Sequence, residues 1–73
     1  MYYTITIQKF KNTDPEASSM LGYATIQAAT SACFSTLASA AADNTIKSCV
    51  CMIINSEGSV QRFEKYEAPT QNG

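Results

Sequence analysis

The sequence predicts an α+β protein with one domain, in which a small antiparallel sheet of three or four strands carries one helix packed on one face, with several copies joined as a homo-oligomer. Three observations lead to this class. β-branched and aromatic residues alternate near the N-terminus, residues 26–41 form an alanine-rich stretch without glycine or proline, and a β-rich run at 45–54 precedes a glycine turn. Strands that flank a single helix are typical of α+β proteins.

Residues 2–10 are predicted to form the first strand, because their side chains alternate in character. Tyr3, Ile5 and Ile7 point to one side of this strand, while Tyr2, Thr4, Thr6 and Gln8 point to the other. Asn, Asp and Pro residues at 11–15 indicate a turn. Two interpretations remain for residues 17–23. They form a second strand that pairs back as a hairpin, or they belong to a helix that begins at Asp14-Pro15.

The central helix is the clearest element of the sequence. Thr25 is a suitable N-cap, and Asp43-Asn44 is expected to end the helix, with Asn44 in the left-handed conformation. Apolar residues recur at spacings of three and four, at Ile26, Ala29, Cys33, Leu37 and Ala40. This spacing places them on one helix face, which we expect to pack against the sheet.

Residues 45–54 predict a strand that is apolar on both faces. Ile46, Val50, Met52 and Ile54 are assigned to one face, and Cys49, Cys51 and Ile53 to the other. Residues 55–58 form the expected hairpin turn, in which Gly58 supplies a positive φ. The more polar residues 60–66 are expected to return as an edge strand. We therefore expect one domain over residues 1–68 and a flexible C-terminal tail over 69–73.

All eleven charged residues lie outside residues 17–42, so the predicted helix has no charge on its outer face. Two interpretations compete. The helix is a tolerant, Ala- and Ser-rich surface element, or its outer face meets a second copy of the chain. A chain of 73 residues buries only about 60% of its unfolded surface, which favours assembly. The predicted oligomer interface consists of Ser31, Ser35, Ala38 and Ser39.

Composition excludes several functions. A net charge of −1 argues against binding to a nucleic acid polymer, and the absence of His removes the commonest general base and metal ligand. No glycine-rich phosphate loop is present. We therefore expect no enzyme activity, catalytic residue, metal or cofactor. Three cysteines are an odd number, which predicts free buried thiols in the cytoplasm.

The sequence gives no reason to expect a membrane location. The N-terminus lacks the basic segment and the continuous apolar run of a signal peptide. Residues 20–42 are long enough to span a bilayer, but they contain few large aliphatic residues. We expect a cytoplasmic protein that does not bind membranes.

Two segments of the chain have residues that are suited to ligand binding. Cations and aromatic residues interleave at 9–11 and 61–66, and Arg62 is the only guanidinium in the chain. Such a pattern offers a stacking platform beside an anionic group. The predicted ligand-binding residues are Phe10, Tyr23, Arg62 and Tyr66. The alternative interpretation is that they are ordinary edge-strand residues with solvated charges.

Three segments carry a resemblance to known proteins. They are Met1-Tyr2-Tyr3, Thr25-Ile26-Gln27-Ala28-Ala29 and Glu57-Gly58. Together they make the chain similar to short uncharacterised proteins encoded by Gram-positive bacteria and their phages, a resemblance that implies no activity. In size and oligomeric habit the chain also resembles phage anti-defence sponges, which hold nucleotide immune signals between subunits without cleaving them.

The second resemblance implies a non-catalytic phage-type binding protein. Such a protein would sequester a small anionic, nucleotide-derived ligand at a subunit interface, and it would act in the host cytoplasm by inhibiting defence signalling. The alternative is a protein–protein inhibitor or interaction module that acts through an exposed strand edge. A third possibility is an accessory structural protein without a ligand.

Overall fold

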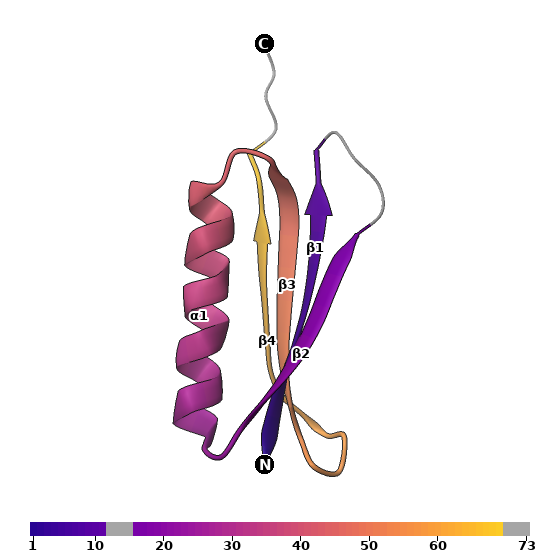
Figure 1. Cartoon of the computed structure of the whole chain (residues 1–73), viewed down its shortest axis with the longest axis vertical. Helices are drawn as coiled ribbons and strands as arrows, with labels where there is room; N and C mark the ends of the chain where they lie inside the picture. Colours follow the sequence, from indigo (N-terminus) through magenta and orange to yellow (C-terminus); the bar gives the residue numbers. More distant parts are fainter. Residues whose placement is uncertain (12–15, 70–73) are drawn as a thin grey trace.

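Four strands and one helix follow one another in the order ββαββ in the computed structural model, which describes residues 1–11 and 16–69. The elements are β1 (Tyr2–Phe10), β2 (Ala17–Tyr23), α1 (Ile26–Ala42), β3 (Ile46–Asn55) and β4 (Val60–Glu67). The strands form one antiparallel sheet in the order β2-β1-β3-β4 (Figure 1). This confirms the α+β class and the strand interpretation of residues 17–23; the helix interpretation of that segment is wrong.

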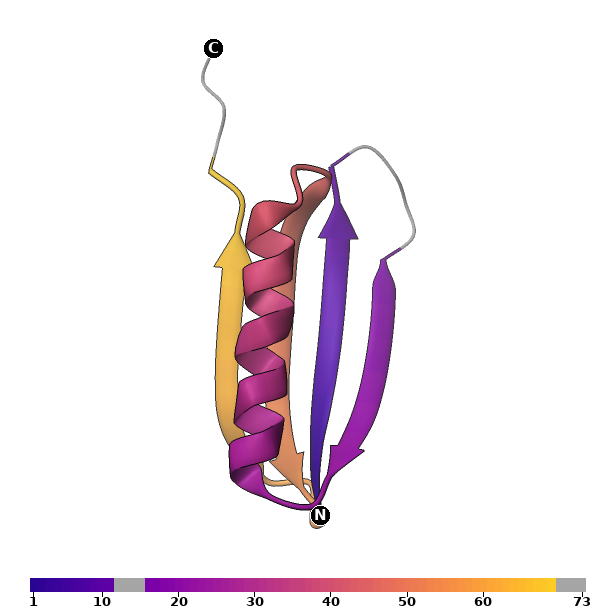
Figure 2. The same cartoon turned by 60° about the vertical axis from the view of Figure 1, so that its left-hand side comes forward.

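The helix covers only part of one sheet face. In Figure 1 the sheet is seen close to edge-on, with α1 on one side and no other helix or strand on the opposite side. Figure 2 shows α1 in front of β3, while β1 and β2 lie beside it. The helix packs mainly on β3 and contacts β2 least. The hairpin of β1 and β2 is therefore only partly covered.

The fully buried side chains under the helix are mostly small or polar. The core consists of Ala29, Cys33, Ala40, Ile46, Cys49, Cys51 and Ile53. Thr4 and Thr6 are buried beside it, on the same face of β1 as Gln8. Small helix residues let α1 approach the sheet closely, so this core has little volume. The predicted core face of the helix is confirmed at Ala29, Cys33 and Ala40, which are buried.

Most of the larger aliphatic side chains of the sheet lie on its other face, which we call the open sheet face. Its apolar residues are Tyr3, Ile5, Ile7, Met20, Val50, Met52, Ile54, Val60 and Phe63. No described helix or strand covers it. The strand β3 is thus apolar on both faces, as its sequence predicts, but only one face has a partner layer within the chain.

Local interactions explain where the helix begins and ends. Thr25 Oγ1 accepts a hydrogen bond from the Ala28 N–H at 3.2 Å, which confirms the predicted N-cap. At the other end, the Asp43 carboxylate accepts hydrogen bonds from the Thr45 N–H at 2.9 Å and the Thr45 hydroxyl at 2.7 Å. Asp43 has an extended backbone, and no described residue other than glycine has a positive φ. The left-handed conformation expected at Asn44 is therefore wrong, because the Asp43 side chain turns the chain instead.

The last two strands follow the prediction with small shifts. Gly58 has φ +84°, which confirms its role in the turn, and β4 lies at an edge of the sheet. The assignment of Ile46 to the face of Val50 is wrong. Pairing shifts between Lys9 and Phe10, so that Ile46 is opposite Phe10 and is buried with Ala40 under the helix.

Two expectations concern the ends and the environment of the chain. The expected tail at 69–73 lies, beyond residue 69, outside the described residues. Within residues 1–11 and 16–69, no helix has the length and apolarity needed to cross a membrane.

Candidate functional site

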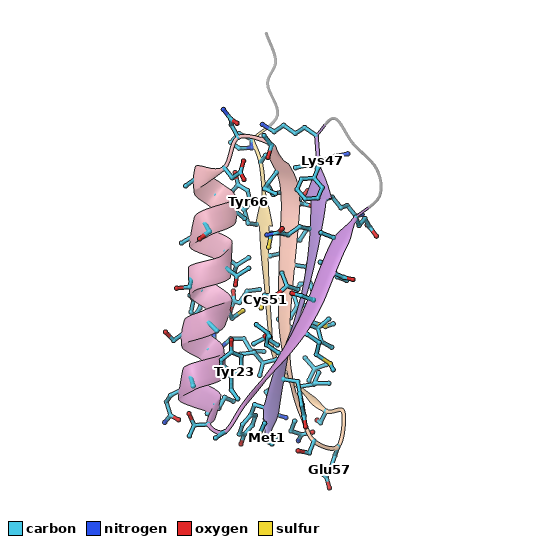
Figure 3. The ribbon with its side chains drawn as sticks, in the orientation of Figure 1. Met1, Tyr23, Lys47, Cys51, Glu57 and Tyr66 are labelled. Atoms are coloured by element: carbon cyan, nitrogen blue, oxygen red, sulfur yellow. The ribbon has the colours of Figure 1, made fainter. Side chains whose placement is uncertain are left out.

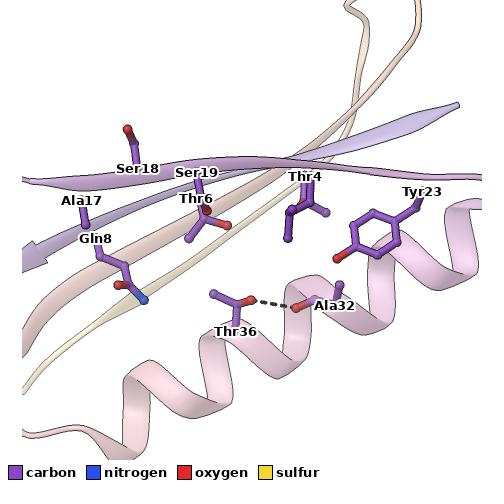
Figure 4. Close-up of a pocket in the computed structure, with 10 residues that line it drawn as sticks. Thr4, Thr6, Gln8, Ala17, Ser18, Ser19, Tyr23, Ala32 and Thr36 are labelled. Carbon is purple, nitrogen blue, oxygen red and sulfur yellow. Dashed lines mark hydrogen bonds between the residues drawn. The ribbon is translucent and has the colours of Figure 1, made fainter.

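A groove of about 310 Å³ lies between α1 and the hairpin of β1 and β2. It forms because the helix sits over β3 and leaves the inner face of this hairpin open (Figure 2). Its polar lining includes Thr4, Thr6, Gln8, Ser19, Tyr23 and Thr36. Figure 4 shows Thr6, Gln8, Thr36 and Tyr23 directed into the space between helix and sheet, whereas Ser18 points away from it.

The β1 donors in this groove have weak partners. The Thr6 hydroxyl donates to Cys51 Sγ at 3.7 Å, and Gln8 Nε2 donates to Cys49 Sγ at 3.9 Å. Thiol sulfur is a weak acceptor. A ligand oxygen or ring nitrogen would be a better acceptor for both donors, so these two groups are chemically free to bind one.

The helix side of the groove is more firmly fixed. The Thr36 hydroxyl donates to the carbonyl oxygen of Ala32 at 2.9 Å, a bond drawn in Figure 4. This bond holds the side chain in one rotamer and leaves the oxygen lone pairs available as acceptors. The groove therefore presents both donors and acceptors to its interior.

Tyr23 supplies the aromatic wall. Its ring is half-buried and packs against the cluster of Ala29, Cys33, Cys51 and Ile53. Packing fixes the ring, so a planar group can lie against it with little loss of side-chain entropy.

The groove is electrically neutral, since none of the residues that line it carries a charge. Recognition in it must therefore depend on hydrogen bonds and on contact with the Tyr23 ring.

The structure separates the four predicted ligand-binding residues. Phe10 and Tyr66 come together against Ala40 and Cys49, at one end of the sheet. Tyr23 is opposite Tyr2 at the other end of β1, so that Tyr23 and Tyr66 lie near opposite ends of the sheet (Figure 3). These two aromatic sites are therefore distinct, and only Tyr23 lines the groove.

Arg62 is engaged within the chain. Its guanidinium lies 2.7 Å from a carboxylate oxygen of Glu64 and 5.4 Å from the centre of the Phe34 ring. A ligand phosphate would compete with both contacts. The predicted interface residues Ser31, Ser35, Ala38 and Ser39 are all exposed on the helix; their role as an interface stays a prediction.

The three thiols are free and buried, as the sequence predicts. Burial, and then the hydrogen bond and charge of Cys51, raise the pKa of Cys33 from 9.0 to about 12, and burial also raises the pKa of Cys49. Protonated thiols are poor nucleophiles and poor metal ligands. Among the described residues, no group of three His, Cys, Asp or Glu side chains is placed to hold a metal ion.

Sequence reasoning missed Thr4, Thr6, Gln8 and Thr36 as site residues. The signal was present in the alternation of residues 2–10, which places a polar face opposite an apolar one. The alternation does not show on which face of this strand the helix packs. No family model, curated protein or solved structure matches this chain.

Proposed function

We propose that the protein is a non-catalytic, homo-oligomeric binding protein that sequesters a small polar ligand in the groove between α1 and the β1–β2 hairpin. The observation that carries this proposal is the set of hydroxyl and amide groups that face one neutral groove beside the Tyr23 ring. Two of these groups, on Thr6 and Gln8, donate to a thiol sulfur, and no better acceptor for them is found among the described residues. A ligand that offers oxygen or nitrogen acceptors would gain these bonds.

Nucleotide-derived signals are the ligand class that we propose. A nucleobase has a planar face for Tyr23 and an edge with both donors and acceptors for Thr6, Gln8 and Thr36. The volume of about 310 Å³ is at the small end of ligand sites and suits a base with its sugar. The phosphates would remain in solvent at the mouth of the neutral groove. Sequestration would lower the free concentration of such a signal in the host cytoplasm and so inhibit defence signalling.

A binding role without catalysis agrees with the chemistry of the chain. It contains no His, and the pKa values of Cys33 and Cys49 are raised by burial. Arg62 is paired with Glu64. The residues of the groove can hold a ligand, but they offer no group that is suited to proton transfer at neutral pH.

A thermal-shift series tests this function. The chain is melted alone and with cyclic dinucleotides, cyclic ADP-ribose isomers and mononucleotides, each at a range of concentrations. A ligand at 100 times its Kd stabilises the folded state by about 2.7 kcal/mol. We expect at least one member to raise Tm, and we expect Gln8→Leu and Tyr23→Leu to abolish the shift. Ser35→Ala, which lies outside the groove, is the control. Flat melting curves over the whole series would disprove the proposed function.

The exposed edge of β2 favours a second candidate function, that of a protein–protein inhibitor or interaction module. The residues of β2, Ala17–Tyr23, carry no charge and nearly all are exposed. The opposite edge, β4, carries Arg62, Glu64, Lys65 and Glu67, which discourage pairing. An extended segment of another protein could add to β2 as a fifth strand. This candidate predicts a partner whose binding is lost in Ser18→Pro and kept in Gln8→Leu.

A further inference from the structure

The open sheet face is a continuous apolar surface. One row of side chains crosses all four strands at its centre: Met20 is opposite Ile5, Ile5 is opposite Met52, and Met52 is opposite Phe63. Further rows add Ile7 beside Val50, and Tyr3 beside Ile54. Met20 and Phe63 end the central row and are more than half exposed. An exposed apolar surface of this kind marks an interaction site.

The fully buried core under the helix is small. Its large aliphatic residues are Ile46 and Ile53, its other members are alanines and cysteines, and half-buried residues, Leu37 and four aromatic side chains, pack around it. On the opposite face, β1 and β3 carry a further set of large apolar side chains: Tyr3, Ile5, Ile7, Val50, Met52 and Ile54. Domains bury the apolar face of a sheet against another layer. Residues 1–11 and 16–69 supply no such layer for the open sheet face, so it must come from outside them.

We infer that a second copy of this chain covers the open sheet face, so that two sheets pack face to face in a twofold-symmetric dimer. This inference depends on the homo-oligomeric state in the proposed function and is independent of the ligand. The groove lies on the helix side of each sheet, and it stays accessible in such a dimer.

The charges of the open sheet face are compatible with a second copy. They occur at one end of the sheet as two ion pairs, Lys9 with Glu16 at 3.5 Å and Lys65 with Glu67 at 3.3 Å. Each pair is neutral, so the face has no net charge that would repel its own copy or select a partner of opposite charge. The other residues that the described strands place on this face are uncharged.

The available area is sufficient for a small dimer. Four strands spaced about 4.8 Å apart and three rows about 6.8 Å apart, two residues along each strand, give a flat footprint of about 400 Å² per copy. The relief of the side chains adds to this value, which brings the total for two copies to about 1,000 Å², the lower end of specific interfaces. We therefore expect a dimer that dissociates on dilution.

The positions of the charges select the orientation. A twofold axis parallel to the strands places the charged end of one sheet over the charged end of the other. It also places each apolar row over the same row of the second copy, with the order of the strands reversed. Ile5 then faces Met52 of the second copy, and Met20 faces Phe63 of the second copy. An axis perpendicular to the strands would instead bury the ion pairs against Tyr3 and Ile54. Desolvation of those charges disfavours that arrangement.

Sedimentation velocity of charge variants tests the inference. In Met20→Lys/Phe63→Lys, like charges face each other twice across the proposed interface, and we expect the mass of one chain, 7.9 kDa. In Met20→Lys/Phe63→Glu, opposite charges face each other, and we expect the dimer to be restored. Within one chain the two positions lie about 14 Å apart, three strand spacings, so neither variant forms a close internal pair.

Two controls make the result specific. Leu21→Lys changes a neighbour of Met20 with similar exposure, 58% against 62%, on the other face of β2, and we expect it to remain dimeric. Ser35→Glu tests the interface that the sequence predicts on the outer face of the helix. The present inference places the interface on the open sheet face instead, so we expect this variant to remain dimeric as well. The inference is overturned if the wild type has the mass of one chain at every concentration, if the Lys/Lys variant stays dimeric, or if Ser35→Glu dissociates the dimer. Circular dichroism confirms that each variant is folded. If the wild type is a dimer but no compound of the thermal-shift series raises its Tm, the proposed ligand is refuted and the proposed interface is not.

Discussion

Met52 and Phe63 are direct partners across β3 and β4, and both side chains lie on the sheet face that α1 does not cover. The residues on either side of Met52, Cys51 and Ile53, are fully buried beneath the helix. The central strand is therefore apolar on both sides, and only one side is covered within the chain. This asymmetry connects the fold to the proposed assembly, because the uncovered side needs a second layer.

The cap of the helix gives a prediction for stability. Thr25→Ala removes the oxygen that accepts the Ala28 N–H, and we expect a loss of about 1 kcal/mol in the free energy of unfolding. Urea denaturation at fixed protein concentration measures it. Thr25→Ser retains the oxygen and should unfold close to the wild-type midpoint. Equal stability of the Ala and Ser variants would show that the cap is not stabilising.

The turn glycine gives a second prediction. Gly58 has φ +84°, and a Cβ at this position would contact nothing within 4 Å. The effect of Gly58→Ala must therefore arise from the backbone conformation, at a cost of about 1–2 kcal/mol. Gly58→Asn should lose less, because Asn adopts positive φ more readily than Ala. The order Gly, Asn, Ala in thermal midpoint checks this reason, and an Ala variant as stable as the wild type would contradict it.

Most of the fold can be predicted from the sequence, because its signals are local. The alternation of apolar and polar side chains predicts β1, Thr25 predicts the start of α1, and Gly58 predicts the last turn. The two errors have different origins. The shift in pairing beside Phe10 moves Ile46 to the other face, and it depends on how two strands meet. The bond from Thr45 to Asp43 replaces the left-handed conformation expected at Asn44; it is local, and the competing turn chemistry of Asp43 was overlooked.

The candidate site could be predicted less well, for a similar reason. The groove depends on where α1 lies over the sheet, and the spacing of helix residues does not determine this position. The interleaved cations and aromatic residues predict that Arg62 binds a ligand, but its charge is paired with Glu64. Tyr23 is the one predicted ligand residue that lines the groove.

The buried thiol of Cys33 predicts how stability depends on pH. Its pKa is raised from 9.0 to about 12 in the folded chain. Between these values the unfolded chain releases the thiol proton while the folded chain retains it. The contribution of this thiol to the free energy of unfolding is therefore fully present below pH 9, and it is lost as the pH rises toward 12. Melting at pH 7.5 and at pH 10 under reducing conditions measures this loss.

Cys33→Ala isolates the contribution of this thiol to the pH dependence. The variant lacks the thiol, so we expect a smaller drop in Tm between the two pH values than in the wild type, whatever its absolute stability. An equal drop in both proteins would mean that Cys33 makes no contribution.

The neutral groove predicts that ligand affinity depends little on salt. Charge-based capture weakens steeply as ionic strength rises, whereas hydrogen bonds and aromatic contact do not. We expect the Kd of any ligand that raises Tm to change less than about twofold between low and physiological salt. Arg62→Gln should bind as the wild type does. A strong salt dependence that disappears in Arg62→Gln would move the site from the groove to β4.

Chemical cross-linking tests the central claim, that the second copy lies on the open sheet face with Met20 opposite Phe63. Facing sheets are about 10 Å apart, a distance that a short bismaleimide spans. Met20→Cys and Phe63→Cys are prepared as separate proteins, and the buried native thiols give the background. We predict that a mixture of the two variants forms a cross-linked dimer, while each variant alone and a mixture with Leu21→Cys in place of Met20→Cys do not. A mixture that yields no more cross-linked product than the single variants would contradict the claim.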